Sequence, residues 1–299
     1  MKAKMFAGFA LALSLLAPAI SAPISFETGA LLVEKRGDDG PAVILIPGLA
    51  SGPWAWENTA ARLASTHTLY LVTLPGFDGR APQPGVTLES LQGDLLQLIE
   101  SRHVQKPVIM GHSLGSTLSI AFATKHSAKI AGVVAIDGLP VFPGTENMPA
   151  DRSQLANRTR AQMGSQSRDQ FAAYQRTYMT QMGVLDASVA LKLAELSIRS
   201  DVAAVADFGG QILALDLRPQ LSNITVPVLA ISPFNAPDFA RMGLDENAKT
   251  EWYRRLFSGV KRLEVVSISP ARHYVMFDQP QKFAEVIDDA LARMTNAKQ

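Results

Sequence analysis

The 299-residue sequence contains no cysteine. Its fold therefore does not rely on disulfide bonds, and thiol catalysis, thiolate zinc sites and a lipid-modified cysteine are excluded. An excess of one charge is also lacking, since 28 Lys and Arg residues balance 27 Asp and Glu residues and no basic run stands out. This balance makes nucleic acid an unexpected partner. The sequence has no spaced histidine and carboxylate cluster suited to a metal and no glycine-rich phosphate turn, so it implies no cofactor.

Long apolar stretches are confined to the N-terminus. Lys2 and Lys4 precede an uncharged stretch over 5–20, and small residues follow it. We expect residues 1–22 to be a secretory signal peptide that is removed on export, which gives a periplasmic or secreted protein with no stable membrane span. A retained anchor is the alternative, but Pro18 interrupts the stretch, which is shorter than the roughly 20 residues of a membrane span.

Short β-rich apolar runs alternate with helical patterns after this segment. The runs at 43–46 and 133–136 are apolar at every position, as in strands that are buried on both faces of a sheet. Such alternation indicates an α/β fold with a mostly parallel central sheet and helices on both faces.

The strand pattern is interrupted in the middle of the chain. Residues 139–223 show helical patterns, and strand-like runs return afterwards. The sequence therefore predicts a core formed by residues 23–138 and 224–299, with an inserted helical cap at 139–223.

One pentapeptide carries the strongest chemical signal. Gly111 and Gly115 flank Ser113 between a predicted strand that ends at Met110 and a helix that begins at Leu114. A serine on so sharp a turn needs small residues on both sides, and the turn exposes its hydroxyl above the carboxyl edge of the sheet. This pattern predicts that Ser113 is a nucleophile.

A serine nucleophile needs a base that accepts its proton. The chain has five histidines. His273 follows the last predicted strand and precedes the C-terminal helix, so it can reach the edge of the sheet that carries Ser113. The others, His67, His103, His112 and His126, fit solvated, capping or packing roles. We therefore predict that His273 is the general base.

These motifs resemble the α/β-hydrolase superfamily, in particular its serine esterases with a helical cap between strands six and seven. In that family, a histidine-glycine turn after strand three supplies half of the oxyanion hole, and Pro47 and Gly48 match this turn here. The resemblance implies that the backbone amides of Leu49 and Leu114 form the hole, because a backbone donor does not require the histidine that Pro47 replaces.

The acidic member of the triad departs from the family pattern. Relatives usually carry an aspartate after strand seven, but Asn235 stands near that position. An amide orients a histidine without stabilising the imidazolium by a full charge. Two carboxylates remain as candidates: Asp137, at the end of strand six, where some relatives carry their acid, and Asp238, which requires a longer loop after strand seven. We favour Asp137 and keep Asp238 as the alternative.

The prediction is a Ser-His-Asp serine hydrolase that cleaves a small or medium hydrophobic carboxylic ester. Four apolar side chains of the predicted cap, from Phe142, Tyr174, Tyr178 and Met182, are expected to contact this small-molecule substrate. Lactonase, amidase, carbon-carbon hydrolase and haloperoxidase-like chemistry are alternatives on the same scaffold. Asn235 and Pro47 also keep open a binding protein that has lost catalysis.

Overall fold

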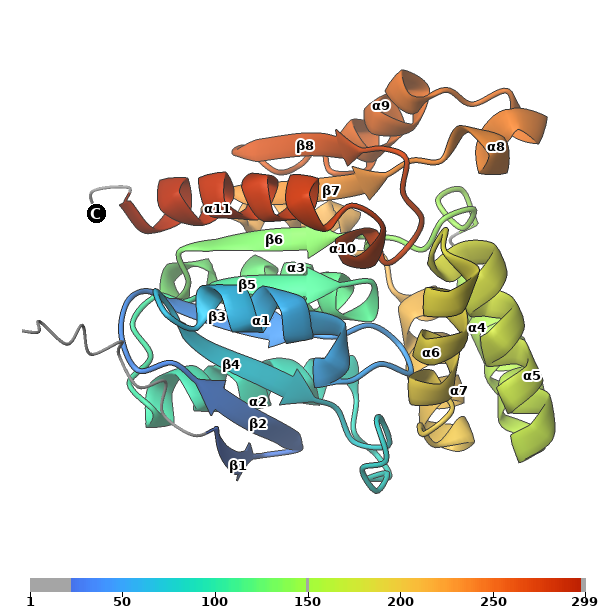
Figure 1. Ribbon diagram of the computed structural model, residues 1–299, viewed down its shortest axis with the longest axis horizontal. Coiled ribbons are helices and arrows are strands. Elements are labelled where there is room, and N and C mark those ends of the chain that lie inside the picture. The colour runs from blue at the N-terminus through green and yellow to red at the C-terminus, as the bar shows by residue number, and fades with distance from the viewer. Residues whose placement is uncertain (1–22, 149–150, 297–299) are drawn as a thin grey trace, which may run out of the picture.

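The computed structural model describes residues 23–148 and 151–296, and an eight-stranded sheet lies at its centre (Figure 1). The strands are β1 (Ile24–Thr28), β2 (Leu31–Arg36), β3 (Ala42–Ile46), β4 (Thr68–Thr73), β5 (Val108–His112), β6 (Gly132–Ile136), β7 (Val228–Pro233) and β8 (Leu263–Ile268). Their order is β1-β2-β4-β3-β5-β6-β7-β8. β2 is antiparallel to both β1 and β4, and all other neighbours are parallel. The predicted mostly parallel α/β sheet is confirmed.

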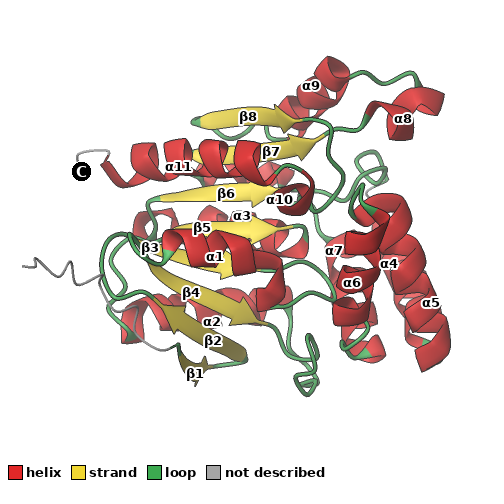
Figure 2. Cartoon of the chain, viewed as in Figure 1, coloured by secondary structure: helices red, strands yellow, loops and turns green. Residues whose placement is uncertain are grey.

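Helices cover both faces of this sheet (Figure 2). They are α1 (Glu57–Leu63), α2 (Leu88–Ser101), α3 (Leu114–His126), α4 (Arg152–Gly164), α5 (Arg168–Tyr178), α6 (Ala187–Ser197), α7 (Val202–Ala214), α8 (Ala236–Phe239), α9 (Glu246–Leu256), α10 (Val275–Asp278) and α11 (Pro280–Asn296), with short helical turns at Pro53–Trp56, Ser127–Lys129, Met179–Gly183, Arg218–Asn223 and Ala240–Met242. Side chains of α2, α3 and α9 form one buried cluster, and those of α1, α10 and α11 form another.

Strand β3 shows why the sheet is apolar throughout. Ile44 and Ile46 belong to the α2 and α3 cluster, whereas Val43 and Leu45 belong to the α1 and α11 cluster. All four side chains are fully buried. Because successive side chains of a strand point to opposite faces, a strand with helices on both sides must be apolar at every position.

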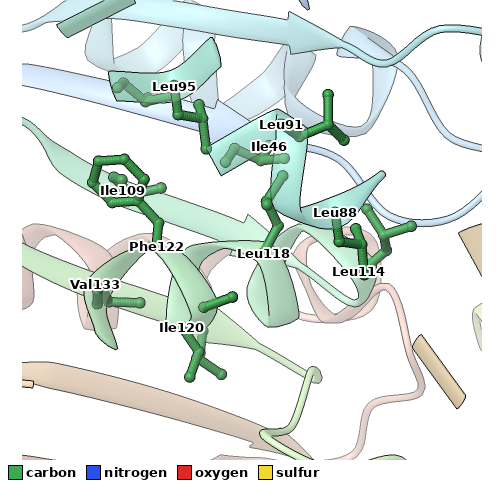
Figure 3. Packing of buried hydrophobic residues seen from close by; sticks show 14 of the residues in the cluster. Ile46, Leu88, Leu91, Leu95, Ile109, Leu114, Leu118, Ile120, Phe122 and Val133 are labelled. Atoms are coloured by element: carbon green, nitrogen blue, oxygen red, sulfur yellow. The ribbon is translucent and has the colours of Figure 1, made fainter. Parts of the chain in front are cut away.

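The helices α2 and α3 pack together over the centre of the sheet. Figure 3 shows Leu91 and Leu95 of α2 near Leu118 and Phe122 of α3, with Ile109 of β5 beside them. All five are fully buried. Each such side chain contributes about 1.5–3 kcal/mol to folding, so this packing fixes α3, and with it the residue that precedes α3, on the sheet.

Helices α4 to α7 lie between β6 and β7 in the chain and form a helical segment at the carboxyl ends of the parallel strands (Figure 1). Within it, α4 packs closely against α7. A Cβ atom on Gly210 of α7 would lie 3.0 Å from Nε of Arg160 and 3.3 Å from the carbonyl oxygen of Ala156. The glycine therefore permits the close approach of the two helices.

The helical segment is held to the loops at the edge of the sheet by hydrogen bonds and an ion pair. Ser197 Oγ donates to the carbonyl oxygen of Ala50 at 2.9 Å, and the Asp201 amide donates to that of Gly76 at 2.7 Å. Arg199 forms an ion pair with Asp78 in the loop after β4. These contacts join the α6–α7 connection to the loops after β3 and β4. They therefore fix the position of the helical segment relative to the carboxyl edge of the sheet.

The predicted signal peptide, residues 1–22, lies outside the described residues. Across 23–148 and 151–296, the structure contains no helix that is both long and apolar enough for a membrane span.

Candidate active site

Ser113 lies in a tight turn between β5 and α3. Its φ of 54° and ψ of −116° fall in a region that L-residues rarely adopt, and its amide donates to the carbonyl oxygen of Ile136 at 2.8 Å. A Cβ atom on Gly111 would lie 2.2 Å from the backbone of Gly115, and one on Gly115 would lie 2.2 Å from the carbonyl oxygen of Ile46. Both flanking glycines are thus needed for the turn, as the pentapeptide predicts.

His273 lies in the loop between β8 and α10. Its Nδ1 is 2.6 Å from Oδ2 of Asp137. An ionised carboxylate accepts a hydrogen bond from a protonated Nδ1, so this contact leaves Nε2 as the nitrogen with a free lone pair. The backbone of His273 is held on both sides, because its amide donates to the Met182 carbonyl oxygen at 3.1 Å and its own carbonyl oxygen accepts from His112 Nε2 at 3.0 Å.

Asp137 directly follows β6, and its φ of 43° is left-handed. Its amide donates to the Ile231 carbonyl oxygen of the neighbouring strand β7 at 3.0 Å, which continues the β6–β7 pairing past the end of β6. The two carboxylate oxygens have different partners: His273 contacts Oδ2, and the Tyr253 hydroxyl donates to Oδ1.

The Asp137 carboxyl is held in its ionised form. Burial alone favours the neutral acid, but the nearby Lys249 ammonium, the His273 contact and the Tyr253 hydrogen bond outweigh burial. Together they hold the pKa of Asp137 well below its usual range. A charged carboxylate therefore faces the His273 ring at neutral pH.

The alternative acid, Asp238, has other partners. Its two oxygens accept from Nε and Nη2 of Arg272 at 2.8 and 2.9 Å, and Nδ2 of Asn235 donates to Oδ2 at 2.9 Å. Among the described residues, Asp238 makes no hydrogen bond to the His273 ring. Asn235, at the position where relatives usually carry the acid, instead supports the Asp238–Arg272 ion pair.

The loop after β3 packs directly against the Ser113 turn. A Cβ atom on Gly48 would lie 2.9 Å from Nδ1 of His112 and 3.1 Å from Cβ of Ser113. Leu49 and Leu114 both line the cavity next to Ser113. Within 23–148 and 151–296, neither of their amides donates a hydrogen bond, so both remain available to an acceptor in the cavity.

A cavity of about 550 Å³ lies between the carboxyl edge of the sheet and the helical segment. Ser113, His273 and Asp137 all line it. In the described part of the chain Ser113 Oγ makes no hydrogen bond, and it borders the open volume. The structure thus brings Ser113 and His273, which are far apart in the sequence, to one cavity.

The remaining walls of the cavity are largely apolar. The four side chains expected to contact a substrate all line it: Phe142, Tyr174, Tyr178 and Met182. Phe142 is 42% exposed, Tyr174 46% and Met182 56%, so they lie at its mouth. Side chains of α4 and α7 line another part, including Met163, Val205, Ile212 and Leu213.

Sequence reasoning missed the contributions of α9 and of His112. Tyr253 and Lys249 lie one helical turn apart on α9, a helix that the strand and helix pattern did not predict. His112 was expected to have a packing role, and the structure adds its hydrogen bond to the His273 carbonyl. Burial lowers the pKa of His112 to about 3, so its ring is neutral and Nε2 donates. One feature of the sequence could have indicated these contributions. Asn235 stands near the position expected for the acid, so residues elsewhere in the chain must orient His273.

Comparison with known proteins identifies the family. Residues 43–286 match the model of the alpha/beta hydrolase family. The pimeloyl-[acyl-carrier protein] methyl ester esterase of Klebsiella pneumoniae (strain 342) is 26% identical over 199 residues, which cover 65% of this chain and 75% of the relative.

Two solved structures share the fold. The enol-lactonase of Burkholderia xenovorans LB400 has a TM-score of 0.71 at 20% identity and covers 90% of this chain and 100% of its own. A thermophilic esterase of Thermogutta terrifontis has a TM-score of 0.72 at 19% identity and covers 92% of this chain and 100% of its own. With a family match that spans most of its length, this chain belongs to the alpha/beta hydrolase family.

Proposed function

We propose that the protein is a serine hydrolase that cleaves carboxylic esters through an acyl-enzyme. In this proposal, Ser113 is the nucleophile, His273 the general base and Asp137 the acid that orients it. The observation that carries it is the 2.6 Å contact between His273 Nδ1 and Asp137 Oδ2, beside a cavity that Ser113 also lines. A nucleophile, a base and a buried carboxylate that holds the base form the working unit of serine hydrolases.

The reaction follows from these positions. Ser113 Oγ attacks the ester carbonyl carbon while its proton moves to Nε2 of His273. The amides of Leu49 and Leu114 stabilise the negative oxygen of the tetrahedral intermediate, and each such donor is worth about a hundredfold to a thousandfold in rate. The bond to the alcohol oxygen breaks, and that oxygen takes the proton from His273. Water then attacks the acyl-enzyme by the same route, releasing the carboxylic acid and restoring Ser113.

The cavity supports a small or medium hydrophobic substrate. Its volume of about 550 Å³ suits a small molecule, and its walls beyond the catalytic groups are mostly apolar. We infer that the helical segment, residues 139–223, acts as a cap that shields the acyl-enzyme from bulk water. We also propose that residues 1–22 direct export to the periplasm or the exterior.

Hydrolysis of p-nitrophenyl esters tests this function. We expect measurable turnover of short and medium acyl esters by the wild type and loss of turnover in Ser113→Ala. The matched control is Ser222→Ala, because Ser222 is exposed on a short helix before β7 and is not among the described residues that line the cavity. Turnover that persists in folded Ser113→Ala would refute the serine mechanism, and a folded wild type without turnover on any ester would favour a binding protein.

A further inference from the structure

Helix α9 presents two buried polar side chains to the same carboxylate. Tyr253 is 2% exposed, and its hydroxyl donates to Oδ1 of Asp137. Because His273 holds Oδ2, the Tyr253 hydrogen bond fixes the rotation of the carboxylate plane. A tyrosine that only filled space would have no use for a hydroxyl at this position, since phenylalanine buries the same ring without a polar atom to satisfy.

Lys249 lies one turn earlier on α9 and is 6% exposed. Its ammonium donates to the carbonyl oxygen of Pro233 and lies 4.8 Å from the ring centroid of Phe239. Within the described ranges it forms no direct ion pair, but it lines the same small pocket as Asp137 and Asp238. A buried charge without a direct counter-ion costs several kcal/mol of stability, so its presence here points to a role of the charge itself.

Lys249 is the main permanent positive charge near Asp137, because the other ionisable groups around this carboxylate are neutral, already paired or acidic. Asp238 is already neutralised by the two hydrogen bonds from Arg272. On the β5 side, the His112 ring is neutral because of its burial. Tyr178 faces the site from α5 and carries no charge at neutral pH, since burial raises its pKa well above the usual range. His273 itself becomes cationic during the reaction, so its charge is not a permanent support.

We propose that Lys249 and Tyr253 are positioning residues that keep Asp137 ionised and hold its Oδ2 toward His273. This inference rests on the proposed function of His273 as the base. In this arrangement, α9 supports an acid that follows β6, although α9 itself lies between β7 and β8 in the chain. The Lys249 ammonium stabilises the negative charge of Asp137, and the Tyr253 hydrogen bond sets the orientation of the carboxylate.

The ionisation of Asp137 can be measured without any assay of activity. In protein labelled with ¹³Cγ-aspartate, the signal lost in Asp137→Asn identifies the Asp137 carboxyl. We expect this signal to stay at its ionised position from pH 7 to pH 4 in the wild type. In Lys249→Met/Tyr253→Phe, the groups that oppose the effect of burial on Asp137 are removed. The pH midpoint of the Asp137 titration should therefore rise above about 4, the ordinary pKa of an aspartate.

Matched control substitutions separate this effect from general changes in packing. Lys129 is an exposed lysine paired with Glu100, and Tyr70 is a buried tyrosine on β4. Lys129→Met/Tyr70→Phe makes the same chemical changes outside the cavity and should leave the Asp137 signal unchanged. Near-ultraviolet circular dichroism confirms that each variant is folded. A double variant whose Asp137 signal matches the wild type at every pH would overturn the proposal.

Ester kinetics give a second readout in the single variants. We expect Tyr253→Phe to lower kcat about tenfold, the worth of one hydrogen bond to a charged group, with KM nearly unchanged. A structural role alone would instead change stability and leave kcat in place. If the NMR result holds but the wild type cleaves no ester, the proposed function fails and the electrostatic role stands. If the wild type is active and the Asp137 signal does not move, this inference alone fails.

Discussion

Asp137 and Asp238, the two candidate acids, contact different parts of the loop that carries His273. Asp137 contacts the His273 ring, whereas Asp238 contacts the side chain of the preceding residue, Arg272. Arg272 also donates to the Thr180 carbonyl oxygen at 2.9 Å, which ties the loop to the helical segment. Asp137 therefore contacts the ring and Asp238 holds the Arg272 side chain, whereas a third carboxylate, Asp278, holds the backbone of the loop by accepting from the Arg272 amide at 2.8 Å.

This division predicts unequal effects of two matched substitutions. Asp137→Asn should lower kcat about a hundredfold or more with little change in KM, because it removes the charge that stabilises the imidazolium. Asp238→Asn weakens a partly exposed ion pair and should lower kcat by no more than about tenfold. Steady-state kinetics on one ester measure both. The opposite ranking would assign the catalytic acid to Asp238.

At the residue scale, the sequence predicts the groups defined by local motifs better than those defined by distant contacts. The turn around Ser113 follows from two glycines within the same pentapeptide. The acid that contacts His273 does not follow from a local motif, because Asp137 and Asp238 both lie near the His273 loop. Only the positions of β6, β7 and α9 in the fold show which of the two contacts the ring. The sequence therefore favours Asp137 as the acid but keeps Asp238 as the alternative.

Among the secondary elements, helices α2 and α3 each contain a glycine, and the space around the two glycines differs. Gly93 lies inside α2, and a Cβ atom there would meet nothing within 4 Å. Gly115 lies in the first turn of α3, where a Cβ atom would be 2.2 Å from the Ile46 carbonyl oxygen. The first glycine weakens a helix without a packing reason, and the second is required by the turn.

Alanine at these two positions should therefore have opposite effects on stability. Gly93→Ala should raise the free energy of unfolding by about 0.5–1 kcal/mol, because alanine loses less entropy in a helix. Gly115→Ala should lower it by about 3 kcal/mol, because the added methyl group forces the backbone apart. Urea denaturation measures both changes. A stable, active Gly115→Ala protein would show that the turn tolerates a side chain.

Helix α7 offers a separate test of the cavity. Gly209 lines it, and a Cβ atom there would lie 3.5 Å from Met163 Sδ and 3.6 Å from Leu49 Cδ2, which are ordinary contact distances. Gly209→Ala should thus be accepted. The larger side chain of Gly209→Leu should occupy cavity volume and lower kcat/KM for an octanoate ester about tenfold relative to an acetate ester. Equal losses for both esters would mean that the acyl chain extends elsewhere.

Element prediction from sequence succeeds where the pattern is long and periodic. The helix expected from Leu114 is α3, which begins at that residue and is buried at every position from Leu114 to Thr124. The strands β1 and β2 and the helix α9 were not predicted. β1 lies at the edge of the sheet, and its first four residues are exposed or half-buried, so it lacks the apolar run that marks the central strands.

For the whole molecule, the buried His112 ring links stability to pH. Its pKa is about 3 in the folded protein, compared with an ordinary value of 6.5. Between these values the unfolded chain binds a proton that the folded chain does not, so stability rises with pH. As the pH falls from 6.5 toward 3, this group should reduce the free energy of unfolding by about 1.4 kcal/mol per pH unit. Asp137 acts in the same direction only below pH of about 4, because its pKa is lowered from the aspartate range.

Urea denaturation at a series of pH values between 7 and 4.5 checks this dependence. His112→Gln should flatten the loss of stability on acidification, because glutamine does not titrate. The exposed His103→Gln serves as the control and should leave the slope in place. Equal slopes for the wild type and His112→Gln would show that His112 is not the source of the acid sensitivity.

In the proposed mechanism, the fold activates the Ser113 hydroxyl through His273. Reaction with a fluorophosphonate tests it directly, because an activated serine displaces fluoride from phosphorus and retains the phosphonyl group. Peptide mapping by mass spectrometry should locate one adduct on Ser113 in the wild type, no adduct in Ser113→Ala and greatly slowed labelling in His273→Ala. A folded wild type that remains unlabelled, or that is labelled at the same rate without His273, would contradict the account.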